Sequence, residues 1–366
     1  MFFFDIPNLL VILIVILVSF RMGLIPLWLS FFLSLFAFIP FILNDVLFPA
    51  SYMPDQFKYF KTVKELRYLD TNFSANLKIW LSTWMLAFIP LPYVETINSL
   101  GFFSRFLATV TVIWLYASKK LRGWPLLFIL FYPSFLLYSS LALRDTLVFT
   151  VMILSVILFL ENRRLLSLLV ALPLTIIKSQ NFFLIIVFYI VHLYFSRGSL
   201  FYKYRYLLII LIIAGIAPSI ISIIELVDFS RRALFMEDGG LYKDYVHVKT
   251  FRDFAIIALQ SAPYFLMKPL PSEASNLFQF VQSIENIFIF IFLVFIFLKT
   301  SRVDKNIAIK WLVYIVAAFS IYGLVVFNFG TAVRYKFPFI IIAVVGMAYE
   351  LYLKHGVFIS IKETKL

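Results

Sequence analysis

Apolar runs of roughly 15–20 residues recur along the chain from Phe2 to Leu353, and a helix needs about 20 mainly apolar residues to cross the hydrocarbon core of a bilayer. The composition agrees, because 63% of the residues are hydrophobic and 14% are charged, whereas soluble domains have about 25% charged residues. We therefore predict an all-α protein whose residues 1–366 form a single transmembrane domain, a polytopic helical bundle of about 11 spans, within a range of about 10 to 12.

Each apolar run is expected to form one crossing that ends at charged or turn-forming residues. The expected crossings are Phe4–Phe20, Met22–Leu43, Leu100–Ser118, Trp124–Leu143, Thr146–Leu160, Leu165–Ile177, Phe182–Ser196, Tyr206–Glu225, Ile284–Leu298, Ile309–Phe327 and Phe337–Leu353. A further apolar stretch, Leu77–Val94, contains Pro90 and Pro92, which disfavour a continuous helix. We expect it to be interfacial or half-inserted within a first outer loop, residues 44–99.

The distribution of Lys and Arg sets the expected orientation. Asp5 precedes the first span and Arg21 follows it, so the N-terminus is expected outside, and the inner segments then hold almost all of the net charge of +13. Membrane orientation explains this excess, and no nucleic-acid partner is expected. In an alternative topology Leu77–Val94 crosses the membrane, the N-terminus lies inside and residues 44–76 face the cytoplasm.

Both topologies place a second long loop, residues 226–283, on the outer face. It is expected to carry a short interfacial helix near Phe254–Met267. Its candidate ligand-binding side chains are Arg231, Arg232, His247, Lys249, Arg252 and Asp253. A solvated loop with internal ion pairs is the alternative interpretation of these residues.

Ionisable groups at membrane depth cost about 2.5 to 3.5 kcal/mol each, so the charges that interrupt apolar runs are informative. Arg144 and Asp145 separate two predicted spans. Asp145 suits an N-cap of the next helix, which would let Arg144 turn toward the bundle, unless the pair is only a charged turn. Lys178 lies between two short runs and is expected to line a cavity, although tilted helices or a thinned bilayer would also explain short runs.

A short outer turn near the C-terminus holds Arg334, Tyr335 and Lys336. Positive charge in a short outer turn opposes the usual orientation rule, so these cations are expected to serve a bound anion. An interfacial anchor with Tyr335 at the headgroups is the alternative.

Missing motifs narrow the expected chemistry. The chain has no cysteine, no Gly-rich nucleotide loop, no HExxH or G-x-S-x-G motif and no D-x-D pair, which disfavours zinc catalysis, nucleotide hydrolysis and a carboxylate-held ion on a diphosphate. No metal and no cofactor is expected. Arg and Lys must then neutralise any phosphate-bearing ligand, and the planar guanidinium pairs two phosphate oxygens at once. Outward arginines beside a membrane cavity suggest a lipid-linked diphosphate.

Four short motifs follow one another along the chain: PDQFKYF with Asp55 and Tyr59, YPSFLLYSSLALRD, MKPLPSE and GTAVRYKFP. Together they resemble the Wzy-type O-antigen and exopolysaccharide polymerases, and the layout is also similar to the C-superfamily of membrane glycosyltransferases. The first motif lacks the paired acid common in that superfamily. The resemblance implies a polymerase at the periplasmic face of the bacterial inner membrane, which moves a growing glycan from one undecaprenyl diphosphate to the next lipid-linked repeat unit.

The resemblance also implies roles for individual residues. Families of this kind use functional arginines in outer loops, and Arg144 and Arg334 occupy such places, where they would meet the charge of the leaving diphosphate. Asp55, His247 and Asp253, in that order, are the candidates for the base that accepts the proton of the attacking hydroxyl, and Asp145 is a weaker candidate because it is expected to cap a helix. The expected substrate-binding residues are Tyr59, Asp145, Lys178, Arg231, Arg232, Arg252, Asp253, Tyr335 and Lys336.

Two other functions stay open from the sequence. A polyprenyl-phosphate-dependent glycosyltransferase or ligase would differ in its donor. A flippase or transporter for lipid-linked oligosaccharide would carry its binding residues near the bilayer midplane, usually within an internal repeat, and no repeat is evident here. The expected partners are the undecaprenyl-diphosphate-linked oligosaccharide and membrane lipid, with a chain-length regulator and a flippase as further candidates.

Overall fold

The computed structural model describes residues 2–69, 77–196, 200–204, 220–237 and 241–356. Helices make up 80% of the structure and no strand occurs among these residues, so the predicted all-α class is confirmed. Five helices are long and apolar enough to cross a membrane, namely Phe3–Arg21, Ile97–Ala117, Leu277–Val303, Lys305–Val325 and Phe329–His355. The chain is thus a multi-pass, membrane-embedded helical protein, whereas the expected count of 11 spans and the face of each loop stay predictions.

The chain forms two compact units, Met1–Ile185 with Ala348–Leu366, and Ile186–Met347. The helices of the first unit are η1 (Phe2–Asp5), α1 (Ile6–Arg21), α2 (Leu27–Phe36), α3 (Ile39–Leu43), η2 (Ala50–Tyr52), α4 (Asp55–Arg67), α5 (Leu77–Ala87), α6 (Ile97–Ala117), α7 (Trp124–Phe131), α8 (Pro133–Tyr138), α9 (Asp145–Leu160), α10 (Arg164–Ala171) and α11 (Leu174–Ile177). The helices of the second are α13 (Leu200–Lys203), α15 (Ile220–Glu237), η4 (Tyr242–Asp244), α16 (Phe251–Met267), η5 (Pro271–Glu273), α17 (Leu277–Val303) and α18 (Lys305–Val325). Helices α12 (Ser179–Phe195) and α19 (Phe329–His355) contribute to both.

Prolines divide three of the predicted spans. Met22–Leu43 breaks before Pro40 into α2 and α3, Trp124–Leu143 breaks at Pro133 into α7 and α8, and Leu165–Ile177 breaks at Pro173 into α10 and α11. A proline removes a backbone donor and pushes the preceding residue toward extended geometry, as at Tyr132 with ψ of 106°. Each of these three runs therefore forms two shorter helices, and its expected crossing of the membrane stays a prediction.

Two other predicted segments differ in part from the structure. The span Tyr206–Glu225 falls mostly on residues 205–219, which lie outside the described residues. Its end belongs to α15, which continues to Glu237 and so converts the start of the expected 226–283 loop into helix. The short helix expected near Phe254–Met267 is present as α16.

The stretch Leu77–Val94 is helical only as far as Ala87. Arg67 at the end of α4 donates hydrogen bonds to the carbonyls of Ala87, Ile89 and Leu91. Backbone that leaves a helix needs new partners when it is shielded from water, and this guanidinium supplies them. With 11 residues, α5 is shorter than the roughly 20 residues that a crossing needs.

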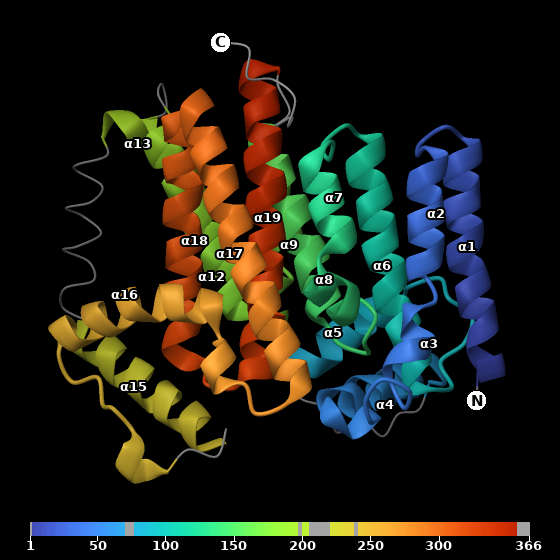
Figure 1. The fold of residues 1–366 in the computed structure, drawn as a ribbon, viewed down its shortest axis with the longest axis horizontal. Helices are drawn as coiled ribbons and strands as arrows, with labels where there is room; N and C mark the ends of the chain where they lie inside the picture. Colours follow the sequence, from blue (N-terminus) through green and yellow to red (C-terminus); the bar gives the residue numbers. More distant parts are fainter. Residues whose placement is uncertain (1, 70–76, 197–199, 205–219, 238–240, 357–366) are drawn as a thin grey trace. The chain divides into compact units, whose positions relative to one another are not determined.

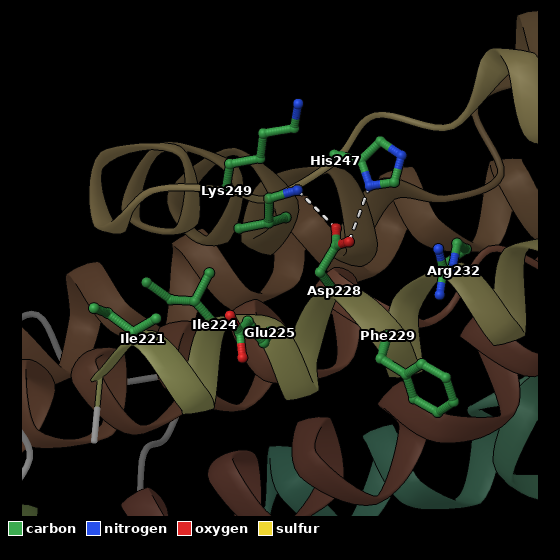
Figure 2. Close-up of a pocket in the computed structure, with 9 residues that line it drawn as sticks. Ile221, Ile224, Glu225, Asp228, Phe229, Arg232, His247 and Lys249 are labelled. Atoms are coloured by element: carbon green, nitrogen blue, oxygen red, sulfur yellow. Dashed lines mark hydrogen bonds and ion pairs between the residues drawn. The ribbon is translucent and has the colours of Figure 1, made fainter.

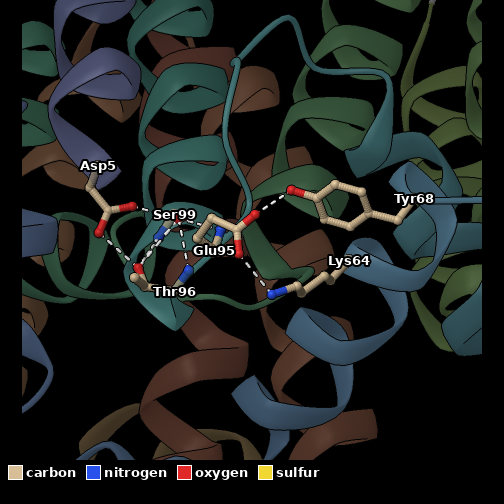
Figure 3. Close-up of polar contacts among 6 residues, drawn as sticks. All are labelled: Asp5, Lys64, Tyr68, Glu95, Thr96 and Ser99. Carbon is tan, nitrogen blue, oxygen red and sulfur yellow. Dashed lines mark hydrogen bonds and ion pairs between the residues drawn. The ribbon is translucent and has the colours of Figure 1, made fainter. Parts of the chain in front are cut away.

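A second set of polar contacts ties the following residues to α1 and α4 (Figure 3). Asp5 accepts hydrogen bonds from the hydroxyls of Thr96 and Ser99 at the start of α6. Glu95 accepts from Nζ of Lys64 at 2.8 Å and from the hydroxyl of Tyr68. Residues 88–96 are therefore fixed to α1, α4 and α6 by side chains, although they form no regular structure.

In the second unit, α17, α18 and α19 stand side by side, and α16 lies across α17 and α18 near one of their ends (Figure 1). Gly323 of α18 allows this crossing, because a Cβ placed on it would lie 2.6 Å from the carbonyl oxygen of Ser261 in α16. Only glycine permits so close a backbone approach.

We expect Gly323→Ala to lower the unfolding temperature in detergent, since overpacking of this kind costs about 1–3 kcal/mol. The matched control is Gly330→Ala, where the nearest atom to the added Cβ is the side-chain oxygen of Asn328 at 3.3 Å, which can move. Equal melting of the two variants would contradict the close packing of α16 on α18.

Candidate functional site

Three of the predicted polar segments meet in the first unit. The guanidinium carbon of Arg144 lies 5.8 Å from the ring centre of Tyr59 in α4, and its Nη1 donates to the carbonyl of Ile177 at 2.9 Å. The next residue, Lys178, places Nζ 3.5 Å from Oδ1 of Asp145. Tyr59, Arg144, Asp145 and Lys178 are called the Arg144 cluster below.

The start of α9 determines where the side chains of Arg144 and Asp145 lie. Arg144 occupies the N-cap position, and no side chain caps the helix. The expectation that Asp145 is the N-cap was wrong, because Asp145 is the first helical residue and its carboxylate faces Lys178. Their side chains are 2% and 8% exposed. A buried carboxylate needs a cation nearby, and this requirement accounts for the pairing.

The Arg144 cluster has an excess of positive charge, with two cations against one carboxylate. The Nε atom of Arg144 is buried and has no hydrogen-bond partner within the described part of the chain. The amino end of the 16-residue helix α9 adds the positive end of the helix dipole. This combination suits an anion with several oxygen atoms, such as a phosphate group.

A buried amide network holds this arrangement in place. Gln56 accepts a hydrogen bond from the backbone nitrogen of Ala142 at 3.1 Å, and it exchanges hydrogen bonds with Asn44 at 3.2 and 3.0 Å. Asn44 also donates to Asn98 at 3.0 Å. Because Gln56 lies in α4 and Ala142 lies two residues before Arg144, the network fixes Tyr59 relative to Arg144.

The base candidate Asp55 lies at the start of α4, one helical turn before Tyr59. Its Oδ1 atom is 3.8 Å from Nζ of Lys58, and the side chains of Asp55 and Lys58 are 42% and 67% exposed. It thus belongs to the helix that carries Tyr59, although the structure places it in an exposed ion pair.

In the second unit, α15 and the segment before α16 bring predicted residues together with unpredicted ones, among them Asp228 (Figure 2). Asp228 accepts hydrogen bonds from the hydroxyl of Tyr245 at 2.9 Å, Nδ1 of His247 at 3.0 Å and the backbone nitrogen of Val248 at 2.7 Å. These four residues are called the Asp228 clasp below. Nη1 of Arg231 donates to the carbonyl of Val246 at 2.7 Å, and this hydrogen bond also connects the segment before α16 to α15.

Residues of the clasp and its neighbours line a cavity of about 430 Å³. Desolvation alone would raise the pKa of Asp228, but the hydrogen bonds from Val248, His247 and Tyr245 outweigh it and lower that pKa. Desolvation and the contact with Asp228 raise the pKa of Tyr245 to about 12. Asp228 is therefore a stable carboxylate that accepts from three donors.

Two loop residues expected at the site have other positions. Asp253 forms a capping box at the start of α16, in which it accepts from the backbone nitrogen of Thr250 at 3.0 Å and donates its own backbone nitrogen to the Thr250 hydroxyl at 3.1 Å. Hydrogen bonds from the side chain and the backbone nitrogen of Thr250 to the carboxylate hold the pKa of Asp253 below its usual value. The side chain of Arg252 is exposed on the same helical turn.

The three residues predicted near the C-terminus lie in the first turns of α19. Lys336 is fully buried and donates to the carbonyls of Leu266 and Lys268 at 3.0 and 2.8 Å and to Asn286 at 2.5 Å. Its ammonium group therefore joins α19 to α16 and α17, and this is a structural role. The guanidinium of Arg334 lies 5.3 Å from the ring centre of Tyr335 and is 8% exposed.

Sequence reasoning missed Gln56, Asn286 and Asp228, which hold these arrangements together. Gln56 stands inside the PDQFKYF motif, and Asp228 lies four residues before Arg232, the spacing of neighbours on one helix face. Asn286 interrupts the apolar face of a predicted span and was a detectable signal of the same kind as Lys178.

No group of three or more His, Asp or Glu side chains that could hold a metal ion occurs within the described ranges. Comparison with known proteins gives no match, since no family model fits the chain and no curated protein or solved structure is significantly similar to it. The resemblance to Wzy-type polymerases stays a prediction, and function has to be inferred from this chain's own geometry.

Removing one member of the buried Asp145–Lys178 pair should destabilise the protein, because it leaves an uncompensated buried charge at a cost of about 3–5 kcal/mol. We expect Asp145→Asn and Lys178→Met each to lower the unfolding temperature in detergent, and the double variant to recover part of the loss. Additive losses in the double variant would show that the two side chains do not form a pair.

The Asp228 clasp should open in acid. The pKa of Asp228 is lowered in the fold, so its stabilising contribution is fully present above the unfolded value of about 4 and is lost as the pH falls through the folded pKa. We expect the Val248 amide to lose protection from hydrogen exchange below about pH 4. In Asp228→Asn this step should be absent, and a step that persists there would assign the transition to another group.

Proposed function

We propose that this chain is a membrane glycosyltransferase that polymerises undecaprenyl-diphosphate-linked oligosaccharide repeat units, as in O-antigen or related polysaccharides, at the periplasmic face of the bacterial inner membrane. The observation that carries the proposal is the position of Arg144. Its guanidinium is preorganised over Tyr59, its Nε atom is buried without a partner among the described residues, and it stands at the positive end of α9.

The chemistry explains why such a guanidinium matters. In the proposed reaction a hydroxyl oxygen of the acceptor sugar bonds to the anomeric carbon of the growing glycan, and the bond from that carbon to the diphosphate breaks. The electron pair stays on the diphosphate oxygen. Donors fixed in place before the reaction stabilise this developing charge without reorganising, and an arginine can pair two oxygens of a phosphate.

Other members of the Arg144 cluster have supporting roles in this proposal. Lys178 supplies a second positive charge beside the phosphate groups, while Asp145 keeps the ammonium group of Lys178 in place. Tyr59 holds the plane of the guanidinium. Arg334, the second arginine expected from the sequence, lies in the other compact unit, and its contribution can be measured separately.

The central test uses a strain that lacks this chain and is complemented with variants. We expect glycan capped at one repeat unit without the chain and full-length glycan with the wild type. Arg144→Ala should lower polymerisation by about 10²–10³-fold, the usual loss on removing one such donor. Arg144→Lys should recover little, because an ammonium group cannot bind two oxygens in a plane.

Arg164→Ala is the matched control, since Arg164 begins α10 with its side chain exposed, and it should polymerise normally. Membrane levels of all variants are compared in parallel. Full activity of Arg144→Ala would remove the proposed diphosphate site. An incomplete repeat unit in the deletion strain would favour a polyprenyl-phosphate-dependent transferase or ligase, and complete units retained on the inner leaflet would favour a flippase.

A further inference from the structure

Arg105 is a buried cation that the proposed reaction does not yet use. It lies in the apolar helix α6, and its side chain is 2% exposed. No acidic side chain lies beside it in the part of the chain that the structure describes. A guanidinium stays charged in proteins, and an ionised group at membrane depth is costly. The hydrogen bonds that offset this cost therefore indicate what Arg105 does.

The hydrogen bonds of Arg105 within the described residues all go to the end of α8. Its Nε donates to Oγ of Ser140 at 2.9 Å, and its Nη2 donates to the same oxygen at 2.5 Å and to the carbonyl of Leu136 at 2.7 Å. The Ser140 hydroxyl in turn donates to the Leu136 carbonyl at 2.8 Å. The planar guanidinium thus closes the turn in which α8 ends.

The segment that follows α8, residues 139–143, is irregular and buried. None of its residues is helical, and each of their side chains is at most 1% exposed. Backbone of this kind needs partners within the protein, because it is shielded from water. Since Arg144 follows directly, the course of this segment determines where the guanidinium of Arg144 lies.

One face of α6 holds this segment. Gly101, Ser104 and Arg105 have the spacing of neighbours on one side of a helix. A Cβ placed on Gly101 would lie 2.6 Å from the carbonyl oxygen of Ser140, so α6 and the segment are in close contact there. The Ser104 hydroxyl donates to the carbonyl of Leu143 at 3.2 Å. Both ends of the segment are therefore fixed to α6, and Arg105 is the charged residue of this face.

We propose that Arg105 is a positioning residue that orients Arg144 toward the diphosphate. Both arginines belong to the compact unit that contains Met1–Ile185. Arg105 holds Ser140 and the end of α8, and the buried segment that continues from Ser140 holds Arg144. This inference rests on the proposed function, because it assigns Arg105 an effect on the same reaction without contact with the reacting atoms.

The first test is Arg105→Lys, studied with the purified protein in vesicles that contain lipid-linked repeat units. Lysine keeps the positive charge but loses the planar set of donors that binds Ser140 and Leu136 together. A shift of about 1 Å at a catalytic group can cost about 10²-fold, so we expect kcat to fall by about 10–10²-fold. The KM for the repeat unit should change little, because Arg144 is proposed to act on charge that develops in the transition state.

The second test repeats the substitution in the Arg144→Ala background. If Arg105 acts through Arg144, Arg105→Lys causes no further loss there, and the two effects are not additive. A substitution that only reduced the amount of folded protein would lower the residual rate again. Rates are normalised to the folded fraction, which is measured by size-exclusion chromatography in detergent.

Thr109→Val is the matched control. Thr109 lies one turn after Arg105 on the same face of α6 and lines the same small cavity, and its buried hydroxyl oxygen has no hydrogen-bond partner within the described ranges. Valine has nearly the same shape, so this variant should polymerise as the wild type does.

Ser140→Ala is a milder second variant, for use where Arg105→Lys does not fold. It removes the Oγ atom that Arg105 binds but leaves the hydrogen bond to Leu136. Its loss of kcat should be smaller than that of Arg105→Lys and should also be absent from the Arg144→Ala background.

Wild-type kcat in both Arg105→Lys and Ser140→Ala overturns the assignment, as does a loss that is equally large in the Arg144→Ala background. If the wild type polymerises and Arg144→Ala is impaired, either result removes only the role of Arg105 and leaves the proposed function. If the purified wild type forms no glycosidic bond, the proposed function fails and this inference fails with it.

Discussion

The exclusion of water from the bilayer core is the constraint on which this structure depends. A polar group at membrane depth must find its partner within the protein, and this chain buries many of them. Asn8 illustrates the rule, because this fully buried residue of α1 donates to the carbonyl of Tyr93 at 2.9 Å and accepts from the Tyr93 backbone nitrogen at 3.1 Å. Irregular segments between apolar helices are possible only where side chains such as those of Asn8 and Arg67 form hydrogen bonds with their backbone groups.

The same constraint distinguishes the functions of the buried charged side chains. Lys336 is fully satisfied by two carbonyls and Asn286, so it holds three helices together. Arg144 differs, because one of its buried nitrogen atoms has no partner within the described residues. A cation that the fold orients but does not fully satisfy is suited to an anionic ligand, and this difference separates a candidate site residue from a structural one.

The sequence predicted the helical class and its membrane character, because hydrophobic run length is a local property. It also identified Arg144, Asp145 and Lys178 as informative, and these residues do meet. It did not predict that Asp145 would pair with Lys178 instead of capping α9, since that choice depends on a residue 33 positions away in the chain. Pro133 and Pro173 indicated helix breaks in the sequence, but the apolar composition around them led us to predict one crossing for each run.

The roles of Lys336 and Asp228 could not be derived from pattern alone. A lysine in an outer turn and an acid in a long loop have many possible partners, and only the packing of α15, α16 and α17 selects among them. Residues with a side-chain partner nearby in the chain, such as Asp253 with Thr250, are predictable in principle from capping rules, whereas the His247 contact requires the return of the chain across α15.

The most direct measurement follows the fate of the lipid carrier. The purified chain is placed in vesicles with synthetic undecaprenyl-diphosphate-linked repeat units, and both the glycan length and the released lipid are quantified. The account predicts one undecaprenyl diphosphate released for each glycosidic bond formed, together with glycans longer than one unit. Release of a polyprenyl monophosphate, or movement of intact lipid-linked units across the bilayer without bond formation, would contradict it.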